Sequence, residues 1–202
     1  HQFLLLNWIE PGSRRQNFWE RFGSALAELH RRTQPDFGFG EHNYIGSLHQ
    51  LNEGAKTWGD FYGQNRIMPL MKKLNRDGQV GSKTIRSAEA LCHKLDDIFP
   101  KEQPSLLHGD LWSGNFMVAA DGNPCIYDPA VYFGHREMDL GMTKLFGGFD
   151  RRFYDAYHWA FPLEKDWEMR TEVTQLYPLL VHAILFGGGY VQRVNTIVNK
   201  LG

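Results

Sequence analysis

The chain has 202 residues, of which 42% are hydrophobic and 22% are charged, so it is long enough to bury a core. Its 22 Lys and Arg residues nearly balance its 23 Asp and Glu residues, for a net charge of -1. This balance excludes a globally basic surface, and we predict no nucleic-acid partner. The 2 cysteines have no CxxC spacing, which disfavours a structural zinc site and indicates a reducing, cytoplasmic location.

The N-terminal part of the sequence is typical of a strand that leads into a helix. The apolar run at 3–6 predicts a strand over residues 2–6, which the turn-forming sequence EPGSRR at 10–15 ends. Apolar residues in 17–32 recur at helical spacing and predict an amphipathic helix. Residues 33–52 are rich in Gly, Pro, Asn and His without periodicity, so we predict a long loop of the kind that often carries function.

Two further helices are predicted before the sequence changes character. One runs from about Thr57 to Leu74, with a bend or a new start near Pro69. The other runs from about Ser82 to Ile98 and ends at the helix-breaking sequence FPKEQP. Residues 104–134 then hold short β-like runs separated by turn signals, and ADGNP at 120–124 predicts the turn of a β-hairpin.

From Glu137 onward the pattern is helical again. The longest apolar run, 176–190, is shorter than a bilayer requires and contains Pro178 and His182. We predict a buried helix that ends at a glycine cluster, and no membrane span. Because no repeat or linker divides the chain, we expect one mostly helical unit with a small embedded β-hairpin.

The predicted hairpin brings oxygen-bearing side chains together. Asn115 begins its first strand and Asp128 ends its second, and the two ends of a hairpin are neighbours in space. Asp110 lies on the loop HGDLWSGN, residues 108–115, that leads into the first strand. Two carboxylates and an amide favour Mg²⁺ held jointly with substrate phosphates over calcium or zinc. Phosphotransferases use this order, with the first aspartate accepting the hydroxyl proton and the other two side chains holding the metal.

A surface loop is the alternative interpretation of HGDLWSGN, because Gly, Asp, Asn and Ser are common in loops. However, His-Gly-Asp followed by four residues and Asn arises by chance in a chain of this length with a probability on the order of 10⁻³. The hairpin and Asp128 are further requirements that the sequence meets. The sequence therefore favours a site where phosphate and metal meet.

The strings LLHGDLWSGNFM and IYDPAVYFGHREMDLGMTKLFGGF resemble the catalytic core of the fructosamine kinase (ketosamine 3-kinase) family. This family belongs to the aminoglycoside-phosphotransferase branch of the protein-kinase-like fold. The resemblance implies an α+β protein, with the last N-lobe strand and hinge at 1–12 and a mostly helical C-lobe with the catalytic hairpin at 13–202. It implies an ATP-dependent, Mg²⁺-using enzyme that phosphorylates the third-carbon hydroxyl of ketosamines, free or on glycated proteins, in deglycation. Fructosamine, ribulosamine and erythrulosamine remain open as acceptors.

The resemblance also implies roles for residues of the loop and hairpin. Asp110 matches the catalytic base, and Asn115 and Asp128 match the metal ligands. His108 matches a position that shapes the loop presenting the base. For Asp139, at the start of DLGMTKLF, the sequence leaves two interpretations open: a helix N-cap, or the family's anchor for the backbone of the catalytic loop.

A nucleotide site is implied at the N-terminal end of the chain. Asn7, Trp8 and Ile9 match the hinge whose backbone binds adenine, and Met117 matches the apolar floor beneath the base. The sequence departs from the family in having no room for the N-lobe lysine and the phosphate-covering loop. We therefore expect the chain alone to be close to inactive, and its exposed hinge strand to favour self-association.

Three residues are candidates for binding the acceptor. Trp112 lies inside the catalytic loop and is predicted to pack against the sugar, although a core position is the alternative. His135 and Arg136 are the other candidates, with a structural cluster as the alternative. The glycines at 187–189 are interpreted as a helix end, because neither a preceding strand nor a GK[ST] sequence marks a phosphate loop.

Two rival functions remain at this point. The same chemistry on an aminoglycoside, choline or homoserine acceptor would keep the fold and the catalytic residues. A non-catalytic C-lobe that serves as an interaction module would be expected to lack Asp110, Asn115 or Asp128, and all three are present. The loop and DPAVYFGHRE strings favour the ketosamine branch.

Overall fold

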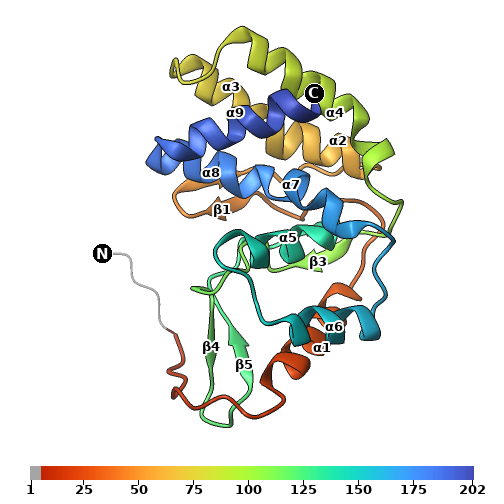
Figure 1. The fold of residues 1–202 in the computed structure, drawn as a ribbon, viewed down its shortest axis with the longest axis vertical. Coiled ribbons are helices and arrows are strands. Elements are labelled where there is room, and N and C mark those ends of the chain that lie inside the picture. The colour runs from red at the N-terminus through yellow and green to blue at the C-terminus, as the bar shows by residue number, and fades with distance from the viewer. Residues whose placement is uncertain (1–5) are drawn as a thin grey trace.

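The computed structural model of the protein describes residues 6–202. The predicted strand at 2–6, and the self-association expected through it, lie outside the described residues except for Leu6, which is exposed. Within residues 6–202, helices dominate and the strands form small two-stranded antiparallel sheets, β1–β2, β3–β6 and β4–β5 (Figure 1). The architecture is α+β, as predicted.

Most connections between the elements of the described chain are short, and the longest spans residues 31–42. The helices are α1 (Phe18–His30), α2 (Trp58–Tyr62), the π-helix η1 (Gly63–Ile67), α3 (Met68–Arg76), α4 (Ser82–Ile98), α5 (Glu137–Leu145), α6 (Arg151–Ala160), the 3₁₀-helix η2 (Trp167–Arg170), α7 (Thr171–Thr174), α8 (Leu176–Phe186) and α9 (Gly189–Leu201). The strands are β1 (Asn43–Ile45), β2 (Leu48–Gln50), β3 (Ser105–Leu107), β4 (Phe116–Val118), β5 (Pro124–Ile126) and β6 (Tyr132–Gly134).

The predicted amphipathic helix is confirmed as α1, but the loop after it is not entirely a loop. Residues 43–50 form the hairpin of β1 and β2, so the prediction of a loop throughout 33–52 is wrong for this stretch. Each strand has only three residues, too few to display alternation in the sequence. Gly46 makes the turn possible, because its φ of 55° is in the left-handed region that glycine tolerates.

The predicted break in the second helical stretch takes the form of a π-helical turn. α2 begins after Thr57, whose side chain accepts a hydrogen bond from the backbone of Asp60. The five residues of η1 follow, and α3 begins at Met68 with Pro69 in its first turn, where proline is tolerated. The wider turn carries Arg66 into the interior, where its side chain is fully buried.

The later elements agree with the predicted pattern, with one omission. α4 spans the predicted 82–98, and the hairpin β4–β5 forms around the predicted turn. The apolar run is the buried helix α8, which ends at Gly187. β6 was not predicted; it pairs with β3, with Leu107 opposite Tyr132. No helix among the described residues is long and apolar enough to cross a membrane.

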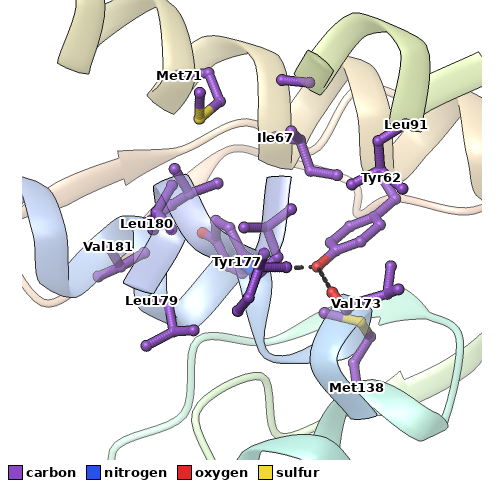
Figure 2. Close-up of a cluster of buried hydrophobic side chains, with 14 of the residues drawn as sticks. Tyr62, Ile67, Met71, Leu91, Met138, Val173, Tyr177, Leu179, Leu180 and Val181 are labelled. Carbon is purple, nitrogen blue, oxygen red and sulfur yellow. Dashed lines mark hydrogen bonds between the residues drawn. The ribbon is translucent and has the colours of Figure 1, made fainter. Parts of the chain in front are cut away.

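Two hydrophobic clusters divide the interior. The larger one joins α2, α3, α4, α8 and α9, which form the upper half of the molecule in Figure 1. Figure 2 shows part of it, where the Tyr62 hydroxyl donates to the carbonyl of Val173 at 2.7 Å and accepts from the backbone N–H of Tyr177 at 3.2 Å. The smaller cluster joins α1 and α6, and β4 packs on it through Phe116 and Val118. The loop that holds Asp110 lies between these clusters.

Candidate active site

The loop between β3 and β4 has a backbone conformation that requires glycine at position 109. Gly109 has a φ of 83°, and a Cβ atom built on it would lie 2.0 Å from the carbonyl oxygen of Ala130. Any other residue here would have to displace the backbone. The ring of His108 contacts the carbonyl oxygen of Tyr127 at 2.9 Å. The start of the loop is therefore clamped against the segment that follows β5.

Asp139 holds the backbone of the same loop through hydrogen bonds from the buried side. Its buried carboxylate accepts hydrogen bonds from the backbone N–H groups of His108 at 2.8 Å and Gly109 at 2.9 Å, and contacts Nε2 of His30 at 3.1 Å. Burial alone would raise the pKa of Asp139, but the hydrogen bond with His30 and the neighbouring imidazoles and N–H groups lower it below its usual range. The N-cap of α5 is Arg136, so Asp139 is not the cap. It makes the anchoring contact that the resemblance implied.

Asp110 and Asn115 are joined directly. The Asn115 amide nitrogen donates to the backbone carbonyl of Asp110 at 2.8 Å and to its Oδ2 at 3.1 Å. Asn115 is buried, and its own backbone is tied to Trp112 and Tyr127. Because the amide nitrogen is held by Asp110, the amide oxygen is the atom left to bind a cation.

Asp128 follows β5 in a strained backbone conformation. Its φ is 57°, one of two positive values at non-glycine residues in the described part of the chain. A positive φ costs free energy in a residue other than glycine, and residues held in strained conformations cluster at functional sites. Asp128 and Asp110 line one cavity of about 390 Å³. The two carboxylates that the sequence predicted to converge thus share a single space.

The environment of Asp110 raises the pKa of its carboxyl group. Burial raises the pKa of Asp110 above its usual range, and the negative charge of Asp128 adds to this rise. The His108 imidazole, the Asn115 amide and the His182 imidazole lower the pKa and offset part of the effect. A carboxylate with a raised pKa is a stronger base, which suits a group that takes a proton from a hydroxyl.

The segment that follows the predicted hinge residues lies beside the catalytic hairpin. Asn7, Trp8 and Ile9 are exposed and outside regular secondary structure, and the Trp8 indole donates to Glu10 at 2.8 Å. A few residues later, the backbone N–H of Gly12 donates to the carbonyl of Val118 at 2.8 Å. The segment is thereby pinned to the end of β4, as its path along the hairpin in Figure 1 shows.

Met117 lies on the face of the hairpin turned away from α1. Phe116 and Val118 pack into the cluster of α1 and α6, and side chains alternate along a strand, so Met117 points to the opposite face. Cys125 is its cross-strand partner on that face. The half-buried Met117 therefore offers an apolar surface that does not belong to the core.

Trp112 joins a series of aromatic side chains near Asp110. Its ring packs edge-on against Phe146 with centroids 5.6 Å apart, and Phe146 packs on His182 at 5.1 Å. His182 in turn contacts Tyr190 at 5.0 Å. In the sequence, His182 is visible only as a polar residue within an apolar run. Its position near Asp110 depends on tertiary packing, and that interruption of the apolar run was the only available signal.

His135 and Arg136 are not brought to the Asp110 cavity. They follow β6 at the end of the β3–β6 sheet opposite the catalytic loop, and both are buried. The Arg136 guanidinium pairs with both carboxylate oxygens of Glu102, at 2.8 and 2.6 Å, and lies over the Phe161 ring. Their contacts are those of a structural cluster, the alternative that the sequence left open, and a role in binding the acceptor stays a prediction.

The burial of His135 makes stability depend on pH. Burial lowers the pKa of His135 to about 4, so the ring is neutral at pH 7 and its Nε2, 3.8 Å from Glu102, forms no ion pair there. A group with a lowered folded-state pKa contributes stability above its unfolded pKa, and this contribution is lost as the pH falls toward the folded value. We therefore expect about 3 kcal/mol of unfolding free energy to be lost between about pH 6.5 and pH 4.

Urea unfolding at a series of pH values measures this loss. His135→Gln should remove most of it, because the substituted side chain does not titrate. His93→Gln, on the exposed surface of α4, serves as the control and should keep the parent dependence. Parallel stability curves for the parent and His135→Gln would show that another group is responsible.

Comparison with known proteins adds an independent line of evidence. The sequence matches the family profile described as fructosamine kinase over residues 1–201. A probable ketoamine kinase of Enterococcus faecium is 42% identical over 203 residues, which cover 98% of this chain and 71% of that protein. The chloroplastic protein-ribulosamine 3-kinase of Arabidopsis thaliana is 37% identical over 201 residues, which cover 98% of this chain and 61% of that protein. A crystal structure assigned as a fructosamine-3-kinase of Thermobifida fusca aligns with a TM-score of 0.88 at 35% identity, covering 96% of this chain and 67% of that one.

Proposed function

The chain belongs to the fructosamine kinase family, and from this premise we propose how its residues carry out the reaction. The protein is an ATP-dependent kinase that phosphorylates ketosamines, the sugar adducts of amines, and so serves deglycation. The proposed target is the hydroxyl on the third carbon of the sugar. Fructosamine and ribulosamine are both candidate acceptors.

The single observation that carries the proposal is the geometry of Asp110, Asn115 and Asp128. Asp110 and Asp128 line one cavity, and Asn115 is hydrogen-bonded to Asp110 at 3.1 Å. A phosphoryl transfer site needs a base for the attacking hydroxyl and oxygen ligands for the metal that bridges the phosphates. These three side chains supply both kinds of group.

We assign the proton transfer to Asp110. Its carboxylate would orient the acceptor hydroxyl and take its proton as the oxygen attacks the terminal phosphorus. The backbone contacts of Gly109 and the anchor at Asp139 hold this carboxylate in place. Most of the catalysis in phosphoryl transfer comes from such positioning, which makes a rigid loop essential.

Magnesium fits the remaining side chains. The Asn115 amide oxygen and the Asp128 carboxylate are hard ligands of the kind Mg²⁺ prefers, and they are too few to complete an octahedral shell. The proposed ion would therefore share its other positions with the nucleotide phosphates and water. When bound, it would neutralise charge on the phosphates during transfer.

The proposed nucleotide and acceptor positions lie on different sides of these three residues. The adenine would lie between the backbone of Asn7 to Ile9 and the apolar surface of Met117. The sugar would contact Trp112, with His182 beyond it in the aromatic series. Aromatic rings are common partners of sugars and of the apolar faces of small ligands.

An ADP-release assay with a panel of acceptors tests the function, and it uses the full-length enzyme, because the relatives extend beyond the region matched by this chain. We expect turnover with fructosamine or ribulosamine adducts of simple amines, dependent on Mg²⁺. An aminoglycoside, choline and homoserine should give no more than the background rate of ATP hydrolysis. Turnover with one of these, and none with a ketosamine, would contradict the proposal.

A further inference from the structure

The cavity that holds Asp110 and Asp128 has a second wall that the catalytic residues do not explain. Its lining includes the hairpin residues Asn43, Tyr44, Ile45 and Gly46. At the turn, a Cβ atom built on Gly46 would lie 3.5 Å from Leu185 of α8, the helix that also carries His182. The hairpin β1–β2 therefore lines the cavity of Asp110 and Asp128 with its first strand, while its turn lies against α8.

A polar network fixes the base of this hairpin to the segment after Asp128. The Asn43 amide nitrogen donates to the carbonyl of Val131 at 2.7 Å, and the Gln50 amide nitrogen donates to Ala130 at 3.1 Å. Gln50 also donates to Asn43 Oδ1 at 2.8 Å and is almost fully buried. Such a satisfied internal network holds the hairpin in one position relative to the catalytic carboxylates.

The network extends into the core through the π-helical turn. Asn52 donates to Asn43 Oδ1 at 2.9 Å and accepts a hydrogen bond from the buried Arg66 at 2.7 Å. The Arg66 guanidinium lies over the rings of Tyr132 at 4.2 Å and Tyr177 at 5.1 Å. The wall is thus built on buried polar groups that contact one another.

Tyr44 is the solvent-exposed residue of this wall. Its side chain is 63% exposed although the neighbouring Ile45 is buried, and its ring packs only by an edge, 5.7 Å from that of His49. An exposed aromatic ring at the rim of a cavity is available for contact with a ligand. The reacting hydroxyl of the sugar would lie deeper, at Asp110, so the amine end of a ketosamine would leave the cavity past the rim.

We propose that Tyr44 is a specificity-determining residue whose ring packs on the amine substituent of the ketosamine. The inference rests on the proposed function and extends it to the choice of substrate. A ketosamine on the ε-amino group of a peptide lysine has a long apolar side chain that would cover the ring. In a ketosamine of methylamine, the substituent on the amine is a single methyl group, which is too short to reach the ring. Tyr44 would therefore favour ketosamines carried by peptides and proteins.

Steady-state kinetics of Tyr44→Ala with these two acceptors test the proposal. We expect the KM for the lysine-peptide ketosamine to rise about five- to tenfold, because the apolar contact between the lysine side chain and the ring is lost. The KM for the methylamine ketosamine should change less than about twofold, as should kcat and the KM for ATP. Tyr44→Phe keeps the ring and should behave as the parent. Trp159→Ala, which removes an exposed ring from α6, is the matched control and should also behave as the parent.

The outcomes separate this inference from the proposed function. Equal KM changes for both acceptors, no change for either, or a change in the KM for ATP would overturn the role of Tyr44. Thermal unfolding of Tyr44→Ala checks that the fold is intact, and Tyr44→Leu, which keeps an apolar side chain, should give a smaller rise in KM. A parent enzyme that binds ATP but phosphorylates neither acceptor would refute the proposed function itself, and the assignment of Tyr44 with it.

Discussion

Asp110→Asn is expected to lower the kcat of the full-length enzyme by about 10²- to 10⁴-fold, the range lost with a general base. The amide is close in shape to the carboxylate, so the hydrogen bond from Asn115 to the backbone carbonyl of residue 110 remains and the loop keeps its anchor at Asp139. What is lost is the group that accepts the hydroxyl proton. Nucleotide binding should stay near the parent value, because this contact matters in the transition state rather than in the ground state.

A coupled ADP-release assay with a saturating ketosamine measures the kcat effect, and fluorescence titration with a nucleotide measures binding. Asp97→Asn is the matched control, because it makes the same chemical change on the exposed surface of α4. The control should retain the parent rate. A kcat for Asp110→Asn within threefold of the parent would remove Asp110 from the proposed role.

Asp128→Ala is expected to impair the enzyme differently, through the metal. The substitution removes a charged ligand, so we expect the apparent affinity for Mg²⁺ to fall and kcat/KM for ATP to drop by about 10²- to 10³-fold, as when one electrostatic contact to a transition state is lost. The substitution also leaves residue 128 in a backbone conformation that alanine tolerates poorly, so the fold must be checked. Asp128→Asn avoids part of this problem and should give an intermediate effect.

Titration of activity with Mg²⁺ at fixed ATP measures the effect of Asp128→Ala. The midpoint should move to a higher Mg²⁺ concentration, and a high concentration should restore part of the rate. Asp97→Ala should titrate as the parent does. Superimposable Mg²⁺ curves for Asp128→Ala and the parent would show that the metal assignment is wrong.

Most of the helices could be predicted because their signals are local. The apolar spacing of α1 and the breaker after α4 are visible in the sequence, as is the turn Asp121 to Asn123 that joins β4 to β5. Hydrophobic periodicity and turn chemistry act over a few residues, so they can be read without knowing the fold. The convergence of Asp110, Asn115 and Asp128 followed from that single hairpin.

The missed elements depend on partners far away in the sequence. β1, β2 and β6 have three residues each, and β6 forms because it pairs with β3 across the catalytic segment. β4 and β5 are equally short, and they could be predicted only because the clear turn sequence ADGNP joins them. The position of Tyr44 could not be predicted for the same reason. The hairpin that carries it lies beside Asp128 because of the buried network around Asn43.

The side-chain partners of the predicted acceptor residues could not be predicted from the sequence either. Arg136 was predicted near the substrate from its place in a family string, but the structure provides Glu102 as its partner, from the segment before β3. His182 was read as a helix residue, yet the aromatic contacts through Phe146 bring it toward Trp112. A side chain's partners are determined by tertiary packing, which a single sequence does not display.

The position of the phosphate in the product tests the central claim most directly. The enzyme would be incubated with ATP, Mg²⁺ and a fructosamine or ribulosamine adduct labelled with ¹³C in the sugar, and the product examined by ¹³C and ³¹P NMR. The account predicts phosphorus coupling to the carbons around the third position of the sugar, absent with Asp110→Asn over the same time. A phosphate on another hydroxyl, or ATP consumption without any sugar phosphate, would contradict it.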